Sequence, residues 1–378
     1  MEYKKIGELT SVVTGGTPKT SHPEYWENGE IPWLQSGCCQ NCDVYSSEKY
    51  ITKEGYDNSS TRLMPADTVM IALTGATAGK IGYLRFEACG NQSITGIFPC
   101  NSLNQRYLFY FLISQRERIL SDCIGGAQPH ISQGYVKDIK IPIPTMEEQQ
   151  SIVKRLETTR QLIDQRQNEI KLLDQLIKAR FVEMFRNMNP SWPTVSIGDI
   201  CTDARTGPFG SALHHDEFVN DGIFVLGIDN AVENRFSFNR MRYITEEKYQ
   251  QLKRYTVYPG DVIITIMGTV GRSAVIPNDM PLAINTKHLA CLTPDYAKVD
   301  SIFLCSAFQM HPDVQRQLNS NTKGAIMDGL NLGIIKGLEF QLPPLQKQKD
   351  FEFFYSQVDK SKCDTSNITS ATQYQLAS

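Results

Sequence analysis

Residues 75–80 (GATAGK) are the string in this chain that most resembles a phosphate-binding loop. That motif requires glycine at the position of Thr74 and serine or threonine at the position of Ile81, so both ends of the match fail. The similar string at 268–272 (GTVGR) has no lysine. We therefore expect two turns lined with small residues, which allow close approach of the backbone, and no phosphate chemistry.

Two further strings imitate catalytic motifs. Residues 189–192 (NPSW) resemble the Asn-Pro-Pro-aromatic loop of amino-methyltransferases but lack the second proline, and a helix stop explains them better. Glu246 and Lys248 have the spacing of half of a metal-dependent nuclease site, but no partner acid is identifiable. A helix with Thr245 as its N-cap explains the same residues. The sequence therefore predicts no catalytic site.

The cysteines and histidines do not form a metal-binding pattern. Cys38, Cys39 and Cys42 form a CCxxC cluster, but no second ligand pair follows at zinc-site spacing. The corresponding segment of the second half of the chain, residues 226–230, has no cysteine. The histidines show neither HxH nor HExxH spacing. We expect reduced thiols and no metal.

Length and composition indicate two domains. The chain has 378 residues, of which 41% are hydrophobic and 21% are charged, and domains commonly have ~100–200 residues. No apolar run approaches the ~20 residues of a membrane span, and the first residues lack the apolar core of a signal peptide. We therefore expect a cytoplasmic protein with no membrane association.

The charge balance is slightly acidic. The net charge is −3, which is not the basic signature of a protein that binds nucleic acid tightly by itself. If DNA is the partner, the phosphate contacts must come from locally grouped cations, or partly from a partner subunit.

The chain is an internal repeat. A segment from Ile6 to Gln149 returns from Ile197 to Gln348 with its landmarks in the same order. Residues 64–79 match residues 258–271 when they are aligned on the aspartates at 67 and 261, and the Asn-Gln pair at 91 then matches the Asn-Thr pair at 285. The period is too long for a solenoid. It indicates a duplicated domain with a pseudo-twofold axis, and therefore a target with two halves.

The most regular stretch joins the two repeats. From Glu147 to Arg186 there is no proline or glycine, and apolar residues follow a heptad pattern typical of a coiled-coil seam. About 40 residues at ~1.5 Å per residue make a helix of roughly 60 Å. Residues 187–193 (NMNPSWP) end it. The apolar seam positions are Ile152, Leu156, Ile163, Ile170, Leu173 and Ile177.

A second helix starts after the second repeat. Phe351, Phe354 and Val358 stand at seam spacing, but the pattern fails after Lys360. The remaining tail is polar and aperiodic. We therefore expect this helix to be short or to fray after about residue 360.

Inside each repeat, short β-rich runs alternate with turns and one clear helix, over 104–120 in the first and 301–318 in the second. This pattern predicts an α+β fold: two similar domains separated by long coiled-coil helices. The predicted boundaries are 1–146 for the first domain, 147–187 for the central helix, 188–345 for the second domain and 346–378 for the last helix.

The ordered set of motifs resembles the specificity subunits of type I restriction-modification systems. GGTPKTSHPEYW followed by IPWLQSG resembles the opening of a target-recognition domain in this family, and TGPFGSALH in the second repeat is similar to a variant opening. The two Gly-Thr loops, the Asn-Gln and Asn-Thr dipeptides, GGAQPHIS and the Pro-rich strand before each long helix also fit. The resemblance covers residues 1–360.

The resemblance implies a non-catalytic, DNA-binding subunit. In this family each recognition domain reads one half of a bipartite sequence in double-stranded DNA, and the helical spacers set the gap. Members hold two methyltransferase subunits, which modify adenine with S-adenosylmethionine, and associate with an ATP-driven restriction subunit. S-adenosylmethionine, ATP and magnesium are thus expected in the partner subunits, and no cofactor is expected in this chain.

Two other classes of function stay open. The chain could be an autonomous DNA nuclease or methyltransferase, although the motifs for metal and cofactor binding are absent. It could also be a coiled-coil scaffold that binds only proteins, which the acidic balance favours.

Side chains that recognise bases are amides, hydroxyls and cations on loops that reach the major groove. We expect such residues near the repeat landmarks of both halves. The candidates are Thr17, Lys19, Ser21, Gln35, Thr77 and Lys80 in the first repeat, and Ser211, His214, His215, Asn230, Arg272 and Lys287 in the second.

Overall fold

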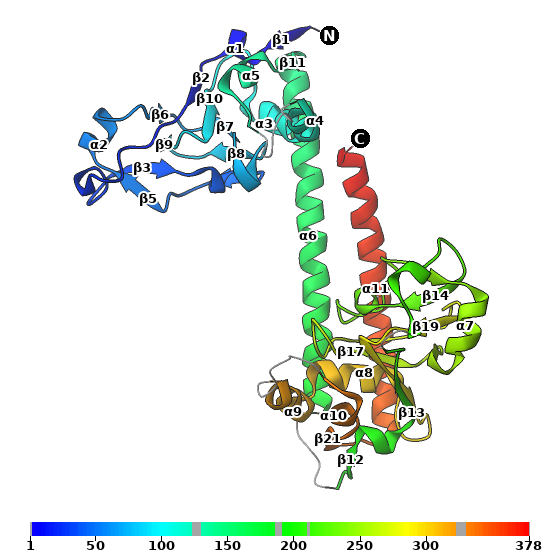
Figure 1. Cartoon of the computed structure of the whole chain (residues 1–378). Helices are drawn as coiled ribbons and strands as arrows, with labels where there is room; N and C mark the ends of the chain where they lie inside the picture. The colour runs from blue at the N-terminus through cyan, green and yellow to red at the C-terminus, as the bar shows by residue number, and fades with distance from the viewer. Residues whose placement is uncertain (1, 123–129, 186–190, 210–211, 323–329, 378) are drawn as a thin grey trace. The chain divides into compact units, whose positions relative to one another are not determined.

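The chain folds into two compact units, residues 1–164 with 370–378 and residues 165–369. The structure is a computed structural model that describes residues 2–122, 130–185, 191–209, 212–322 and 330–377, with the side chains of 321–322 and 364–377 outside the description (Figure 1). We call the two parts unit 1 and unit 2. No described helix is both long and apolar enough to cross a membrane.

Unit 1 contains two mixed sheets and a small strand pair. The larger sheet has the strand order β2-β10-β7-β8-β4, and the smaller has the order β5-β3-β9-β6. β1 (Tyr3–Lys5) pairs with β11 (Lys140–Pro142). The other strands are β2 (Val12–Thr14), β3 (Ile31–Leu34), β4 (Cys42–Val44), β5 (Lys49–Ile51), β6 (Leu63–Met64), β7 (Val69–Ala72), β8 (Ile81–Leu84), β9 (Ala88–Gly90) and β10 (Ile94–Ile97).

Unit 2 repeats this topology, except that its larger sheet has no counterpart of β4 among the described residues. Its sheets have the orders β13-β20-β17-β18 and β15-β14-β19-β16, and β12 (Thr194–Ser196) pairs with β21 (Glu339–Gln341). In each unit the smaller sheet has a parallel pair at its centre, β3 with β9 and β14 with β19. The strands are β13 (Cys201–Thr206), β14 (Ile223–Leu226), β15 (Tyr243–Ile244), β16 (Thr256–Val257), β17 (Val262–Thr265), β18 (Ser273–Val275), β19 (Ala283–Asn285) and β20 (Leu289–Pro294). The α+β duplication is confirmed.

The register of the duplication differs by one residue from the sequence alignment. Asp67 and Gly260 both have a positive φ, 64° and 84°. Each donates its backbone N–H to the carbonyl at the end of the next strand, Asp67 to Leu84 at 2.7 Å and Gly260 to Ile276 at 2.9 Å. Asp261 is thus the counterpart of residue 68, not of Asp67. Glycine and aspartate both tolerate a left-handed backbone conformation. The two units therefore correspond at this left-handed turn, and not at the aspartates that the sequence alignment matched.

The same shift applies to the Asn-Gln landmark. The backbone N–H of Asn91 donates to Leu34, and that of Thr286 donates to Leu226, at 2.9 and 3.0 Å. Residues 91–92 therefore correspond to 286–287, not to 285–286.

Helices cover the sheets of each unit. The expected single helix over 104–120 is two, α3 (Gln105–Ser114) and α4 (Arg116–Asp122), and the one over 301–318 is α8 (Ser301–Met310) and α9 (Pro312–Thr322). Pro312 ends the second pattern because it has no N–H for the helical ladder. Shorter helices are α1 (Ile6–Leu9), α2 (Lys53–Asp57), α5 (Gln133–Asp138), α7 (Glu246–Leu252) and α10 (Leu332–Lys336). Thr245 caps α7, accepting from the N–H of Lys248 at 3.2 Å.

One equivalent interior position holds a charged side chain in unit 2 and a hydroxyl in unit 1. In unit 2 the buried carboxylate of Asp261 pairs with Arg205 at 2.6 Å and accepts from the hydroxyl of Thr293 at 2.8 Å. In unit 1 the counterpart is Thr68, whose hydroxyl donates to the carbonyl of Pro65 at 2.7 Å. Removal of one partner of a buried ion pair costs about 3–5 kcal/mol. These positions therefore cannot be exchanged singly between the units.

The two long helices are α6 (Met146–Phe185) and α11 (Leu345–Ala377) (Figure 1). The heptad positions of α6 from Ile152 to Met184 are all buried or half-buried. In unit 2, the end of α6 packs against the start of α11 in an antiparallel direction. Phe181 and Phe351 have ring centroids 5.3 Å apart, and Lys362 forms an ion pair with Asp174.

α11 extends beyond the point where its apolar pattern ends. The prediction that this helix is short or frayed after about residue 360 differs from the structure, in which the backbone is helical through Ala377. The heptad pattern reports a buried seam, and the end of that seam does not mark the end of the helical backbone. Residues 361–377 contain neither proline nor glycine.

One buried glutamine joins each long helix to the unit that precedes it. In unit 1 the side chain of Gln149 accepts from the N–H of Asn104 at 2.8 Å and donates to the carbonyl of Pro144 at 3.0 Å. Asn104 in turn caps α3. In unit 2, Gln348 accepts from the N–H of Asp300, the cap of α8, at 2.9 Å. We call Gln149 and Gln348 the glutamine clamps.

Substitution of a clamp should destabilise only its own unit. Gln149→Ala leaves the buried N–H of Asn104 without a partner, which costs about 1–3 kcal/mol. Amide hydrogen exchange should show a loss of protection of this size in α3 and at the start of α6, with unit 2 unchanged.

The neighbouring exposed glutamine is the matched control. Gln150 lies on the same helix with its side chain exposed, so Gln150→Ala should leave the exchange pattern intact. Equal effects of the two substitutions would contradict the clamp.

A buried histidine makes unit 2 sensitive to acid. Burial holds the pKa of His311 below its ordinary value of 6.5, and its ring packs between those of Phe181 and Phe340. Below pH 6.5 the unfolded chain takes up a proton that the folded chain resists. The contribution of His311 to the free energy of unfolding should therefore be constant above pH 6.5. Below pH 6.5 this contribution should make the free energy of unfolding fall as the pH drops.

Urea unfolding between pH 5 and 8 measures this slope. His311→Asn keeps an acceptor at the start of α9 but removes the titration, so it should flatten the acid slope. His214→Asn, at an exposed position, should keep the wild-type slope. If His311→Asn leaves the slope unchanged, a group other than His311 causes the acid sensitivity.

Candidate nucleic-acid interface

Four loops of unit 1 lie together where the strands of both sheets end. β3 and β9 run parallel and end at Leu34 and Gly90. The backbone N–H of Leu73 donates to Ser93 at 2.9 Å, and that of Gly16 donates to Gly90 at 2.9 Å. These bonds bring loops 15–17, 35–41, 73–80 and 91–93 to one place, which we call the first loop edge.

Glycine is required where two of these loops meet. A Cβ at Gly15 would lie 2.0 Å from the carbonyl oxygen of Gly90, which no side chain can occupy. This close approach places Thr17 beside Gln92, and the exposed Thr17 hydroxyl donates to the amide oxygen of Gln92. The Gly-Gly pair of the sequence therefore positions a polar pair at the first loop edge.

The structure brings four of the six candidates of the first repeat to this edge. Thr17 and Gln35 are exposed, and Thr77 is half-buried in the turn after β7. The ammonium of Lys80 donates to the side chain of Gln40 at 2.6 Å, which holds it in place. The remaining two candidates, at positions 19 and 21, are exposed on the loop that leads away from Thr17.

Unit 2 has an equivalent second loop edge, formed by loops 227–234, 266–272 and 286–288. The N–H of Ile266 donates to the carbonyl of His288 at 3.0 Å, as Leu73 does to Ser93 in unit 1. Arg272 and Lys287 are exposed here. Neither forms an ion pair with a residue that the structure describes. They are available cations.

The other candidates of the second repeat lie elsewhere. Asn230 is fully buried; its side chain accepts from the N–H of Gly227 at 2.8 Å and donates to the carbonyl of Ser237 at 2.7 Å. Because no polar atom of this side chain is left for a base, we exclude it from the interface. His214 and His215 are exposed on the segment after β13. Ser211 lies outside the described residues.

Several polar residues of the loop edges were not among the candidates. They are Gln40, Thr74, Gln92 and Ser93 in unit 1 and Arg242 and His288 in unit 2. Thr74 donates its hydroxyl to that of Ser93 at 3.0 Å. All of these residues stand next to predicted strands. The sequence does not show which strand ends meet, because that depends on the order of the strands within a sheet. The Asn-Gln landmark was the one signal in the sequence that pointed to Gln92.

His288 lies in a positively charged environment. Partial burial first, and then the charges of Lys287 and Arg242, lower the pKa of its imidazole. Arg242 forms an ion pair with Asp229. A neutral imidazole offers both a donor and an acceptor, so His288 can bond to a base edge.

The cysteine cluster lies in the first loop edge. A hydrogen bond with Cys39 lowers the pKa of the Cys38 thiol, whereas that bond and burial raise the pKa of Cys39. Within the described part of the chain, no group of three His, Cys, Asp or Glu side chains could hold a metal. Cys39 is buried, as is its counterpart Ala231, so the position serves packing.

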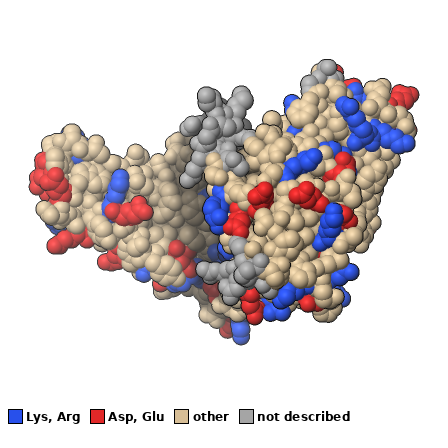
Figure 2. Space-filling view, turned by 90° about the horizontal axis from the view of Figure 1, so that it is seen from below, with Lys and Arg blue, Asp and Glu red and all other residues tan. Residues whose placement is uncertain are grey.

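Charge is mixed on the surface. Figure 2 shows Lys and Arg side chains interspersed with Asp and Glu on the face that it draws. This agrees with the net charge of −3. No extended basic field is visible on this face.

Comparison with known families identifies the duplicated unit. The profile of the type I restriction modification DNA specificity domain matches residues 1–172 and again 189–371. The two matches correspond to the two halves of the duplication.

Individual proteins agree with this match. The specificity subunit of type I restriction enzyme EcoR124I/EcoR124II from Escherichia coli is 33% identical over 162 residues, 42% of this chain and 40% of that protein. The match therefore spans less than half of this relative's length. The MjaVIII specificity subunit from Methanocaldococcus jannaschii is 22% identical over 92% of this chain and 83% of its own.

Solved structures share the fold. The crystal structure of a type I restriction-modification system S subunit from M. genitalium matches 99% of this chain and 93% of that chain, with a TM-score of 0.58 and 15% identity. At this identity the likeness concerns the fold alone.

Proposed function

This chain belongs to the family of type I restriction modification DNA specificity domains, and we propose that it is the non-catalytic specificity subunit of a type I restriction-modification complex. Each unit would recognise one half of a bipartite site in double-stranded DNA. The observation that carries this proposal is a pair of loop edges built on one scaffold but with unlike side chains. Catalysis, with its S-adenosylmethionine, ATP and magnesium, would belong to partner subunits. We place its action in the cytoplasm because the proposed target is DNA.

Equivalent positions of the two edges differ in hydrogen-bonding character. Gln92 of unit 1 corresponds to Lys287 of unit 2, and Ser93 corresponds to His288. A glutamine amide can bond adenine through two contacts, whereas a lysine favours guanine or phosphate. The target halves should therefore differ in sequence, so that the whole site is asymmetric and not a palindrome.

Internal hydrogen bonds prepare the first loop edge for recognition. Thr17 orients the amide of Gln92, and Gln40 holds the ammonium of Lys80. A side chain that is already oriented loses less conformational entropy when it binds. The bonds within the edge thus support base recognition and not a merely solvated surface.

We also propose that α6 serves as a spacer. Its 40 residues at ~1.5 Å each span roughly 60 Å, while one turn of DNA rises ~34 Å. A helix of fixed length can set the gap between two half-sites. The domain boundaries that we propose are 1–146 and 188–345, with α6 and α11 between and after them.

Exposed leucines of α6 suggest where partner proteins bind. Leu172 and Leu176 lie one turn apart, 54% and 48% exposed. Two exposed leucines one turn apart form a contiguous apolar patch, which a protein partner would bury. We propose that methyltransferase subunits, two in the full complex, dock along the spacer and that a restriction subunit joins them. The same leucines favour the alternative of a protein-binding scaffold, which the next experiment separates.

Lys80→Ala and Arg272→Ala should weaken DNA binding by the assembled complex. Loss of a base contact costs about 1–3 kcal/mol, and loss of a phosphate contact also reduces the salt dependence by about one ion. Affinity is measured by fluorescence anisotropy on a site identified by mapping methylated adenines. Subunit association, measured by gel filtration, should not change.

Two lysines at the opposite end of the strands are matched controls. Lys137 is exposed on α5 beside α1, and Lys336 is exposed on α10 at the corresponding place in unit 2. Their alanine variants should bind DNA as the wild type does. Equal affinity of all four variants would remove Lys80 and Arg272 from the interface. An assembled complex that binds no DNA would favour the scaffold.

A further inference from the structure

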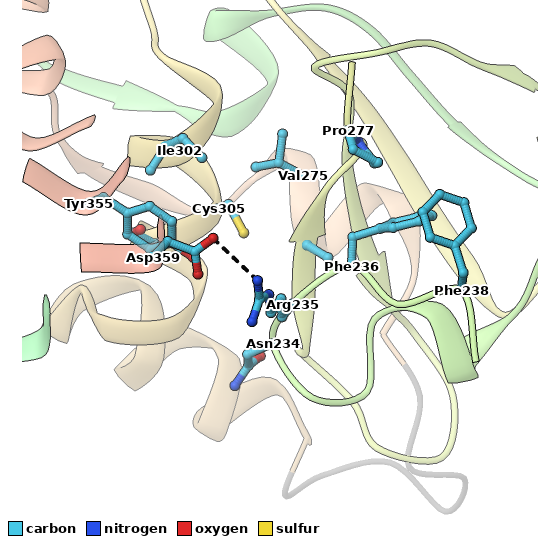
Figure 3. A pocket seen from close by; sticks show the side chains of 12 residues that line it. Asn234, Arg235, Phe236, Phe238, Val275, Pro277, Ile302, Cys305, Tyr355 and Asp359 are labelled. Carbon is cyan, nitrogen blue, oxygen red and sulfur yellow. Dashed lines mark hydrogen bonds and ion pairs between the residues drawn. The ribbon is translucent and has the colours of Figure 1, made fainter. Parts of the chain in front are cut away.

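Unit 2 contains a cavity of about 250 Å³ where α11 meets the sheet and α8. Figure 3 shows it between the loop that carries Arg235 to Phe238, the edge strand β18, α8 and α11. All of these elements belong to unit 2. The cavity borders the second loop edge at Asn234 and extends to Val275, at the far end of β18.

The same place in unit 1 is filled by large side chains. Tyr83 and Phe109 have ring centroids 5.9 Å apart, and the guanidinium of Arg106 lies 4.0 Å from the centroid of the Tyr83 ring. Arg106 also pairs with Asp43 at 2.7 Å. Tyr110 packs on Phe109 with centroids 5.2 Å apart. Aromatic rings and a guanidinium thus complete the packing of unit 1.

Pairing and capping establish which residues correspond. Tyr83 faces Val69 across β7 and β8, as Val275 faces Val262 across β17 and β18. The glutamine clamps align the caps of α3 and α8. Counted from those caps, Arg106, Phe109 and Tyr110 correspond to Ile302, Cys305 and Ser306.

Four large-to-small differences therefore open the cavity. Val275, Ile302, Cys305 and Ser306 line it, and each is smaller than its counterpart in unit 1. Protein interiors are normally packed as densely as organic crystals. This cavity is open on one side, and unit 1 fills the equivalent place with side chains.

The walls of the cavity are mostly apolar and include the polar side chains of Asn234, Arg235, Ser306 and Asp359. The rings of Phe236 and Phe238 contact each other with centroids 4.9 Å apart and line one side, and Tyr355 of α11 lines another. The Oδ2 atom of Asp359 pairs with Arg235 at 3.5 Å. Its Oδ1 atom is buried and has no hydrogen-bond partner among the described residues.

We propose that this cavity is a binding site for a small aromatic ring that carries a hydrogen-bond donor, such as a phenol or an indole. A cavity of roughly 150 Å³ lined by apolar side chains holds benzene, so 250 Å³ accommodates such a ring. The rings of Phe236 and Phe238 offer edge or stacking contacts. The carboxylate of Asp359 lines the cavity and accepts the donor. Such a ligand site goes beyond the DNA-binding function proposed above.

A bound ring would connect α11 to the rest of unit 2. It would touch Tyr355 and Asp359 on α11 and Ile302 on α8 at once. A ligand that binds only the folded state raises the free energy of unfolding with its concentration. Occupancy should therefore hold the last helix more firmly against unit 2.

The test is titration of the full chain with phenol and with toluene, followed by ligand-observed NMR. Phenol should bind with a dissociation constant of about 1 mM or lower, and toluene should bind at least fivefold more weakly because it has no donor. Val275→Tyr restores the residue of unit 1 and should abolish phenol binding. Absence of phenol binding to the wild type at 10 mM would overturn the proposal, as would binding that Val275→Tyr leaves unchanged.

A second variant separates binding from folding. Asp359→Ala removes the acceptor but leaves the walls, so it should equalise the affinities of phenol and toluene. Retained toluene binding shows that the variant is folded. A persistent preference for phenol would exclude Asp359 as the acceptor and refute this geometry.

Discussion

The hydrogen bonds of two buried glutamines determine how this molecule is organised. Gln149 and Gln348 each stand at the start of a long helix and bond to the backbone that caps the main helix of the adjoining unit. A buried amide that bonds at both ends fixes orientation as well as position. Each recognition unit is thereby joined to its long helix in the same way, and differences between the units are confined to their loops and interiors.

Conservation of the scaffold allows the two edges to diverge. Apart from β4, which extends the larger sheet of unit 1, the strand order is repeated in both units. The left-handed turns and the backbone bonds that gather the loops are repeated as well. These features depend on backbone geometry and on few side chains. The positions of Gln92 and Lys287 can therefore change without loss of fold, and the proposed recognition of two unrelated half-sites requires such freedom. The interiors have also diverged, as the Arg205–Asp261 pair and the cavity of unit 2 show.

In the long helices, the heptad pattern of the sequence does not coincide fully with the buried face or with the helix ends. The seam predicted for α6 consists of buried and half-buried positions, but Phe181 and Phe185, which are nearly fully buried, lie one residue beyond seam positions. There the helix packs on the core of unit 2 and not only on α11. A helix of 3.6 residues per turn drifts against a repeat of 3.5 when a broader surface covers it. α11 in turn continues after its seam ends.

The sequence by itself determined the duplication, the α+β class, the long central helix and the absence of recognisable catalytic motifs, because periodicity, punctuation by proline and glycine, and motif spacing are local. The tertiary structure alone decided the register of the repeat, the burial of Asn230, the place of Gln92 at the first loop edge, and the cavity beside Tyr355. These depend on which strands pair and on how side-chain volumes distant in sequence add together. Neither strand pairing nor the sum of side-chain volumes can be deduced from any single stretch of residues.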